Sequence, residues 1–357
     1  MATLAFPTHR DEAWRWSDLP ALQAAAGLPR ISVVPPESLN LGGARLVFVD
    51  GVFDATQSEA GRLAVGPLAL ATDHPLGARA TGAGWSLTLD AAQAETGVEI
   101  VHVSTGAENH VPARILLGED AVASIVETFV GTGWANRLTH VELGRSARLS
   151  RAVRVLHDGG FLSTRDEVSV GQGASYVATV LVAGDVGARI DAQIDITGEQ
   201  AFAEMGGALL TRDSLKQECA VAIRHAAAHG QSNQTWRAVA ADKSAASLAA
   251  RVEVARDAQK TDGVQSLRGL LLERTATINL KPELEIFADD VKCAHGATVG
   301  ELDAKALFYL ASRGIAPGKA RAMLTRAFVG DALDRIGDEA VRAAFASDAD
   351  AWLEAAL

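Results

Sequence analysis

Two residues with metal-binding chemistry, Cys293 and His295, lie two positions apart in the segment LEIFADDVKCAHGATVG, residues 284–300. In an extended strand, residues i and i+2 project from the same face, so both side chains can reach one metal ion. A thiolate and an imidazole suit iron, zinc or the edge of an iron–sulfur cluster. Two ligands do not complete a tetrahedral site. From these residues alone, packing, metal binding and nucleophilic catalysis all stay open.

The face on which Cys293 and His295 lie depends on the register of the residues before them. Alternate positions from Leu284 to Ala288 are apolar and define the inward parity, so an unbroken strand would turn the pair outward. The double acid at 289–290 could reset that register, which leaves both orientations open. An outward pair at the end of a domain needs ligands from another chain to complete a site.

The residues beside the pair have two equal interpretations. Asp289, Asp290 and Lys292 either buffer the charge of a metal ion or form a solvated turn.

The other thiol and the other histidines are weaker candidates. Cys219 shares its parity with Val221 and Ile223, the apolar side of its segment, and we expect it to be a buried, inert thiol. We interpret His225 and His229 as turn or surface residues at strand ends, with metal binding as the alternative. Four further histidines of the strand region receive no role: His102, His110, His140 and His157.

Several catalytic motifs are absent from the sequence. It contains no G-x-x-x-x-G-K-[ST] phosphate loop, so we do not expect the chain to hydrolyse ATP itself. It contains no C-x-x-C pair for a zinc ribbon or a ferredoxin-type cluster, and no G-x-S-x-G nucleophile elbow. We therefore predict no catalytic residues.

The elements that position the candidate pair are short strands. From about 97 to 290 the sequence alternates apolar and polar residues in runs such as GVEIVHVSTG, ASIVETFVG and ASYVATVLVAG, each closed by Gly, Asp or Asn. No helical stretch separates these runs, which excludes a βαβ arrangement. Sandwich, barrel and solenoid are compatible, and the length of the alternating region together with its small inward residues favours a solenoid.

Helices are predicted near both ends of the chain. Residues 9–27 predict a helix, and ARLVFVDGVFD predicts two strands joined by a tight Asp-Gly turn. Three helices are predicted after Gly300. Residues 301–329 carry five basic side chains against two acids, and residues 330–357 carry two arginines against seven acids. This split could dock a partner, although two solvated helix faces also explain it.

Composition limits the class of protein. The 357 residues have a formal net charge of −11, which argues against nucleic acid or an anionic membrane as the partner. No apolar run approaches the roughly 20 residues of a membrane span, and the first residues lack the apolar region of a signal peptide. We expect a cytoplasmic protein with two free thiols rather than a disulfide.

The C-terminal part resembles a known family. The run KPELEIFADDVKCAHGATVG, followed by LFYLASRGI, is similar to the signature of the SufB/SufD family of iron–sulfur cluster assembly proteins. The segments DEAWRWSDL, RLVFVDGVF and PARILLGEDAVASIVETF, and the length of the chain, resemble the SufD branch more than the SufB branch. Arg268 departs from the family pattern, which has Asn at this position in a solenoid turn.

The resemblance implies a fold and a set of partners. It implies a right-handed parallel β-helix at 97–299, a mixed helical N-terminal domain at 1–96 and a helical C-terminal domain at 300–357. It implies pairing with a SufB-like paralogue, or a homodimer, through the β-helix, and docking of a SufC-like ABC-type ATPase on the C-terminal helices. Cys293 and His295 would then bind iron or a nascent iron–sulfur cluster. This cargo is transient and shared with a partner subunit, so the isolated chain is not expected to hold it tightly.

Three other functions fit parts of the pattern. A β-helix polysaccharide lyase or hydrolase needs clustered carboxylates and exposed aromatic residues, and only 5% of this chain is aromatic. A nucleophilic enzyme using Cys293 and His295 lacks an identifiable oxyanion device or a third orienting residue. A purely structural interaction module would bind no metal.

Overall fold

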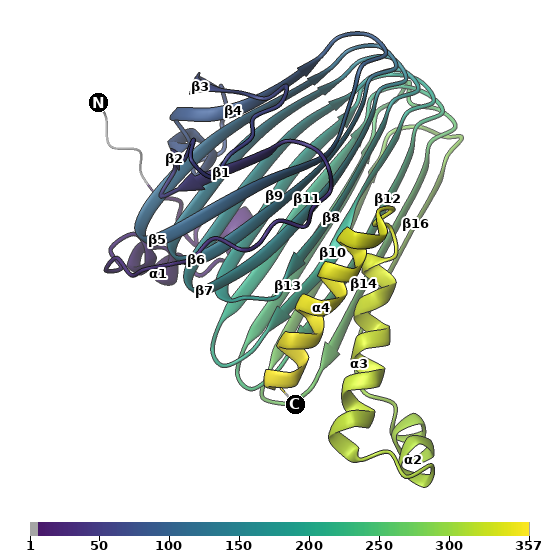
Figure 1. The fold of residues 1–357 in the computed structure, drawn as a ribbon. Helices are drawn as coiled ribbons and strands as arrows, with labels where there is room; N and C mark the ends of the chain where they lie inside the picture. The colour runs from purple at the N-terminus through teal and green to yellow at the C-terminus, as the bar shows by residue number, and fades with distance from the viewer. Residues whose placement is uncertain (1–5, 357) are drawn as a thin grey trace.

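The described part of the chain, residues 6–356 of this computed structural model, forms a flattened solenoid of parallel strands (Figure 1). Three long bent strands build its first turns: β5 (Ala94–Leu117), β6 (Val122–Leu143) and β7 (Arg148–Val170). Later turns use pairs of shorter strands: β8 (Ser175–Val182), β9 (Asp185–Ile196), β10 (Phe202–Thr211), β11 (Lys216–His225), β12 (Gln231–Ala240), β13 (Ala245–Val254), β14 (Asp262–Leu271), β15 (Thr277–Ile286) and β16 (Lys292–Glu301). The predicted parallel β-helix is confirmed.

Two facing sheets result, because each turn contributes one strand stretch to either side. Sheet 1 contains the first halves of β5, β6 and β7, followed by β8, β10, β12, β14 and β16. Sheet 2 contains the second halves of the same long strands, followed by β9, β11, β13 and β15. Because these pairings are parallel and in register apart from bulges at the bends, each side chain lies about 4.8 Å from its counterpart in the next turn.

A left-handed residue recurs at one corner of the solenoid. Seven such corner residues have φ between 57° and 62°: Ala92, Asp120, Ser146, Gly173, Gln200, His229 and Lys260. The N–H of each donates to a carbonyl in the next corner, with N···O distances of 2.6–3.3 Å, and the last bond runs from Lys260 to Asp290. These bonds offset the roughly 1–2 kcal/mol that the left-handed conformation costs a residue with a Cβ. Since only one of the seven is glycine, the sequence shows no readable repeat.

The largely apolar interior contains a buried cluster of charges in the early turns. Glu127, Arg137, Arg151 and Asp166 are each at most 3% exposed. Arg151 donates to Glu127 and, at 3.0 Å, to Asp166, and Arg137 contacts the same two carboxylates. Burial opposes ionisation of Glu127, but the two arginines outweigh it and hold the pKa of this carboxyl well below its usual range. The cluster therefore balances two buried positive charges with two negative ones.

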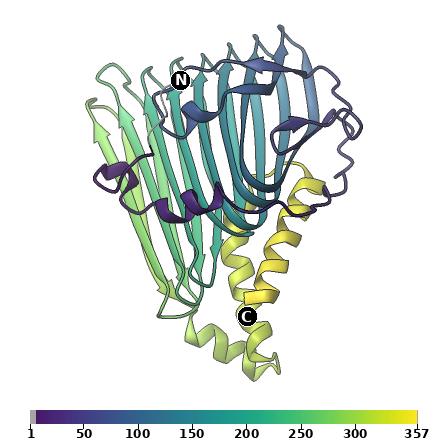
Figure 2. The same ribbon diagram turned by 90° about the vertical axis from the view of Figure 1, so that its left-hand side faces the viewer.

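The N-terminal strap, residues 6–28, crosses the outer face of sheet 2 (Figure 2). The prediction of one helix over 9–27 is only partly right. A 3-10 turn, η1 (Glu12–Trp14), is followed by a separate helix, α1 (Leu19–Ala25). The break has a local cause, because the side chain of Asp18 accepts a hydrogen bond from the N–H of Ala21 and Pro20 occupies the first turn.

Arg189 on β9 ties the strap to sheet 2. Its guanidinium lies 3.7 Å from the ring centroid of Trp14 and donates to Ser17 Oγ at 2.7 Å. It also makes two hydrogen bonds, of 2.6 and 2.9 Å, to Asp191, which contacts His74 Nε2 at 2.9 Å. Burial opposes ionisation of Asp191, but Arg189 and His74 outweigh it and lower the pKa of its carboxyl to about 2.

Small elements lead from the strap into the solenoid. The predicted hairpin in ARLVFVDGVFD is confirmed: β1 (Arg45–Val49) and β2 (Val52–Phe53) are antiparallel, and Asp50 and Gly51 between them both have positive φ. β3 (Ala64–Leu68), the short turn η2 (Gly77–Arg79) and β4 (Gly82–Leu89) follow. β1 and β4 already pair with β5 in parallel, so they extend the ladder of the solenoid.

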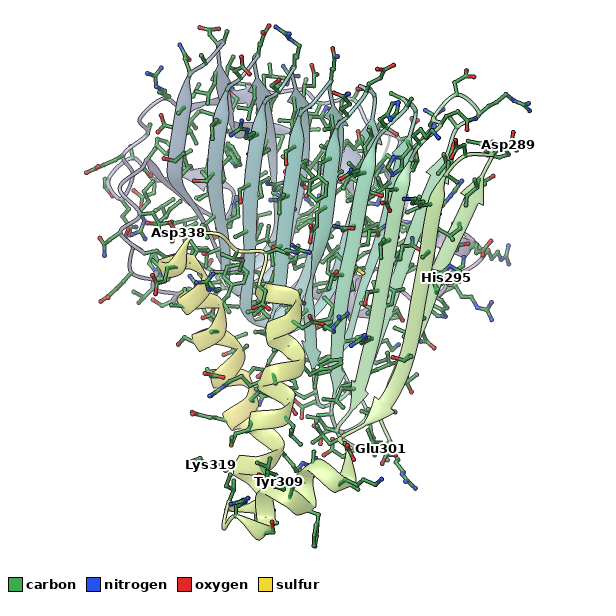
Figure 3. The ribbon with its side chains drawn as sticks, turned by 90° about the vertical axis from the view of Figure 1, so that its right-hand side faces the viewer. Asp289, His295, Glu301, Tyr309, Lys319 and Asp338 are labelled. Atoms are coloured by element: carbon green, nitrogen blue, oxygen red, sulfur yellow. The ribbon has the colours of Figure 1, made fainter. Side chains whose placement is uncertain are left out.

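The three predicted C-terminal helices are confirmed as α2 (Ala304–Ser312), α3 (Pro317–Leu333) and α4 (Glu339–Ala356). α3 and α4 lie on the outer face of sheet 1 (Figures 1 and 3), where Leu333, Phe345 and Trp352 join a buried cluster with Leu181 and Leu210. α3 and α4 therefore pack on the solenoid, because the outward residues of sheet 1 are apolar beneath them. α2 alone has no buried residue.

Within residues 6–356, none of the helices combines the length and the apolar character needed to cross a bilayer.

Replacing Arg151 by Met is expected to lower the free energy of unfolding by about 3–5 kcal/mol, because it leaves the buried carboxylates of Glu127 and Asp166 with a single arginine. Urea unfolding followed by circular dichroism measures this change. Arg145→Met is the matched control, since Arg145 pairs with Glu119 at the surface, and its effect should stay below about 1 kcal/mol. Equal effects at the two positions would contradict the role given to the cluster.

The lowered pKa of Asp191 predicts that part of the free energy of unfolding depends on pH. Its pKa in the folded state, about 2, is below the value of about 3.9 in an unfolded chain. Its contribution, on the order of 2 kcal/mol, is therefore complete above pH ~4 and is lost as the pH falls towards 2. The difference in unfolding free energy between the wild type and Asp191→Asn should shrink over that interval. A difference that stays constant with pH would show that the ionised carboxylate is not what stabilises the strap.

Candidate functional site

The candidate pair lies on the outermost strand of sheet 1. Cys293 and His295 belong to β16, which pairs with β14 on one side and has no neighbouring strand on the other among the described residues. Figure 3 shows His295 on this last strand, beyond the region that α3 and α4 cover. In the register of the two strands, Gly263 lies opposite Cys293 and Gln265 lies opposite His295.

The corner after β15 resets the register, which settles the orientation that the sequence left open. β15 ends at Ile286 and β16 begins at Lys292. Gly263 and Gln265 are buried, and Cys293 and His295 share their parity and hence their inward face. The alternative of an unbroken strand with an outward pair is wrong. The prediction that the two side chains share one face is confirmed.

Although their parity is inward, the two side chains are accessible because no later turn covers them. Cys293 is half-buried and packs at the edge of a cluster with Val252 and Ala288, whereas His295 is exposed. Apolar side chains are exposed at the same end of the solenoid, among them Phe287 at 54% and Val299 at 44%. The solenoid thus ends in an open face with two ligand-type side chains.

The acidic corner does not add ligands to the pair. Asp290 forms an ion pair with Lys260, and its N–H donates to the side-chain oxygen of Gln259 at 3.0 Å. Figure 3 shows Asp289 at the end of the molecule, well separated from His295 along the strand. The interpretation of this segment as a solvated turn is therefore favoured over charge buffering.

The two thiols differ in burial and chemistry. Burial, with the nearby carboxylate of Asp262 adding to it, raises the pKa of the Cys293 thiol. The isolated chain therefore carries Cys293 in the protonated form at neutral pH, and a metal ion would have to displace that proton. Cys219 is 2% exposed and lies between Ile190 and Leu248 in adjacent turns. Its pKa is raised strongly by burial, as expected for an inert thiol.

The other histidines have structural surroundings. His225 donates to or accepts from Ser232 Oγ at 2.8 Å in the interior, and His229 is one of the left-handed corner residues. His102 is stacked between Phe48 and Phe129. Across the described residues, His, Cys, Asp and Glu side chains form no group of three or more that could hold a metal ion. A complete site built on Cys293 and His295 would thus need ligands from outside this chain.

Sequence reasoning missed a polar cleft of about 740 Å³ on the outer face of sheet 2, beside the strap. Its lining includes His140, Glu142 and Glu167. His140 lies 3.0 Å from Glu167, which also accepts from Arg165 at 3.1 Å. The lining residues come from three separate strands, from residues 71–75 and from Ala13 and Trp14 of the strap, so no local motif could have indicated the cleft.

Comparisons with known proteins agree with this architecture. The family model for the SUF system FeS cluster assembly SufBD core domain matches residues 87–328. The iron–sulfur cluster assembly protein SufD of Escherichia coli is 25% identical over 370 aligned residues, which cover 94% of this chain and 86% of that protein. An iron–sulfur cluster assembly SufBD family protein of Synechocystis is 27% identical, with 94% and 85% covered.

The match of the family model runs from β4 into α3 and so includes the whole solenoid and the strand that carries the candidate pair. It covers well over half of the chain, and it confirms the resemblance that the C-terminal signature indicated. The chain belongs to the SufBD family of the SUF system for iron–sulfur cluster assembly.

Proposed function

We propose that this chain is a SufD-like scaffold subunit that handles iron or a nascent iron–sulfur cluster through Cys293 and His295, at an interface with a second β-helix subunit. One observation carries the proposal: both side chains lie on one face of the last, uncovered strand of the solenoid. A thiolate and an imidazole supply two ligands of the kind that iron accepts, and the second subunit supplies the others. The iron or cluster is cargo, and it leaves for another protein.

The open end of the solenoid has the properties of a surface for a second subunit. The free edge of β16 presents backbone N–H and C=O groups that another strand can pair with. Exposed Phe287 and Val299 offer apolar area beside that edge. A SufB-like paralogue or a second copy of this chain, each with a solenoid edge of its own, fits these requirements.

The protonated state of Cys293 supports transient rather than permanent binding. Because burial raises the pKa of its thiol, metal binding must release a proton, and the reverse reaction returns it when the cargo leaves. A site that is completed only by the second subunit also opens when that subunit moves. Both features fit a scaffold better than a resident cofactor site.

The tip of the C-terminal helices is the surface that we propose for a SufC-like ABC-type ATPase. On α2, Phe308 is 76% exposed and Tyr309 is 56% exposed, and Figure 3 shows Tyr309 at the end of the helical segment, away from the solenoid. Two of the five basic residues of 301–329 already have partners, because Arg321 donates to Leu272 O and Arg326 pairs with Asp350. Of the other three, Arg313 lies 5.2 Å from the ring centroid of Tyr309, so a basic group adjoins exposed aromatic side chains, a combination suited to docking.

The alternative to a metal-handling scaffold is a purely structural interaction module. It is supported by one observation, that the described residues hold no complete metal site. The experiment on Cys293 and His295 below separates it from the scaffold with a ligand role. The carbohydrate-active enzyme has less support, because the glutamate nearest His140 in the cleft is held in ion pairs.

Cys293→Ala and His295→Ala are each expected to reduce the iron and acid-labile sulfide in the complex after anaerobic co-expression with SufB-like and SufC-like partners. Folding and assembly should stay near normal, because both side chains lie at the open end. Iron and sulfide assays on the purified complex measure the effect. Cys219→Ala is the control, and it should lower the free energy of unfolding by about 1 kcal/mol through a small cavity without changing the cluster content. Wild-type iron and sulfide in both variants would favour the structural module.

Replacing Phe308 and Tyr309 together by Ser should abolish co-purification with the SufC-like ATPase while the thermal unfolding of the isolated chain stays unchanged, because neither side chain is buried in this chain. The matched control is Phe345→Ser on α4. Phe345 is fully buried against sheet 1, so its loss should destabilise the protein by about 3–5 kcal/mol. Retained ATPase binding by the double variant would place the docking surface elsewhere.

A further inference from the structure

A column of polar side chains inside the last turns ends at His295. Gln234 on β12 lies opposite Gln265 on β14, and Gln265 lies opposite His295 on β16. The two glutamines are 0% and 1% exposed. Because the strands are parallel and in register, each of these side chains lies about 4.8 Å from the next one in the column.

Each glutamine uses its amide in the same way. Gln234 Nε2 donates to the carbonyl of Arg251 at 3.0 Å, and Gln265 Nε2 donates to the carbonyl of Glu283 at 3.4 Å. Both acceptors belong to strands of sheet 2, so each glutamine side chain extends across the interior from sheet 1 to sheet 2. The Oε1 atoms of both glutamines are buried and accept no hydrogen bond from any residue of the described chain. A buried acceptor without a donor is unfavourable, so each of these atoms needs a partner.

The two unsatisfied oxygens have different neighbours. The NH₂ group of Gln265 has a second hydrogen that can serve Gln234 Oε1, one turn below it. No glutamine lies above Gln265, and the next side chain in its column is His295. The ring of His295 is exposed, and it makes no hydrogen bond or ion pair within residues 6–356. Rotation of this unrestrained ring can bring one of its nitrogens to Gln265 Oε1.

We propose that Gln265 is the positioning residue of His295: its Oε1 accepts a hydrogen bond from Nδ1–H of the His295 ring, which leaves the Nε2 lone pair directed to the open face. In this tautomer the lone pair of Nε2, the ring nitrogen farther from the backbone, stays available to a ligand. Metal-binding histidines commonly donate their second nitrogen in this way, which selects the tautomer and fixes the ring. The consequence for iron binding rests on the proposed function, whereas the hydrogen bond itself does not.

The experiment is ¹⁵N NMR of the full chain with labelled histidine, at a pH well above the ordinary histidine pKa of about 6.5. The signals of His295 are assigned among those of the nine histidines, because one pair of ring nitrogen signals is lost in His295→Ala. In the wild type, we expect His295 mainly as the Nδ1–H tautomer. In Gln265→Leu, the ring should return to the Nε2–H tautomer that an unconstrained histidine favours. Gln265→Glu, which keeps an acceptor, should retain Nδ1–H.

Gln234→Leu is the matched control, because it removes an equivalent cross-interior hydrogen bond one turn farther from His295, and it should leave the tautomer unchanged. An Nε2–H tautomer in the wild type would overturn the proposal even if Gln265→Leu did not fold. The same tautomer in the wild type and in folded Gln265→Leu would also overturn it.

Iron retention in the co-expressed complex separates this proposal from the proposed function. If both hold, Gln265→Leu should bind iron about tenfold more weakly than the wild type, and Gln234→Leu should match the wild type. If His295→Ala keeps wild-type iron but Gln265→Leu changes the tautomer, the ligand role fails and the positioning role stands. If His295→Ala loses iron but the tautomer of His295 is the same in the wild type and in Gln265→Leu, the positioning role is wrong.

Discussion

In-register stacking of parallel turns is the constraint on which the rest of this structure depends. At one corner, the N–H of each left-handed residue donates to a carbonyl of the following corner. This bond fixes where every turn begins, and hence which side chains of successive turns lie above one another. Cys219 packs between Ile190 and Leu248 for that reason, and His295 lies opposite Gln265 for the same reason.

The same stacking explains why the candidate site lies at the end of the chain's solenoid. Within the stack, inward residues are covered by the turns before and after them, so a polar residue such as Gln234 must find its partners inside. β16 has a turn on one side only. Inward residues there keep the geometry that the stack imposes, yet they are accessible to another molecule. Position at the last turn thus combines a rigid support with exposure, a combination that interior positions of the solenoid cannot have.

The sequence predicted those features that depend on local periodicity and missed those that depend on corners. Alternation along the strands predicted the β-helix, and i, i+2 spacing predicted that Cys293 and His295 share a face. Whether that face is inward depends on the length of the corner at 287–291, which no periodicity encodes. The seven corner residues belong to seven different amino-acid types, so their common left-handed conformation leaves no motif. The break in the N-terminal helix was, by contrast, readable from Asp18 and Pro20, whose capping and helix-starting roles are local.

The distribution of charge between the early turns and the end of the solenoid follows one physical rule. In the early turns, Glu127 and Asp166 are buried with two arginines, and these arginines hold the pKa of the Glu127 carboxyl well below its usual range. At the open end, burial and the nearby carboxylate of Asp262 raise the pKa of the Cys293 thiol and keep it protonated. In the function proposed above, an iron ion that binds there displaces the thiol proton and forms the thiolate as it binds. The interior has its counter-charges built in, whereas the proposed site would obtain its positive charge from the cargo, so its charge state would be reversible.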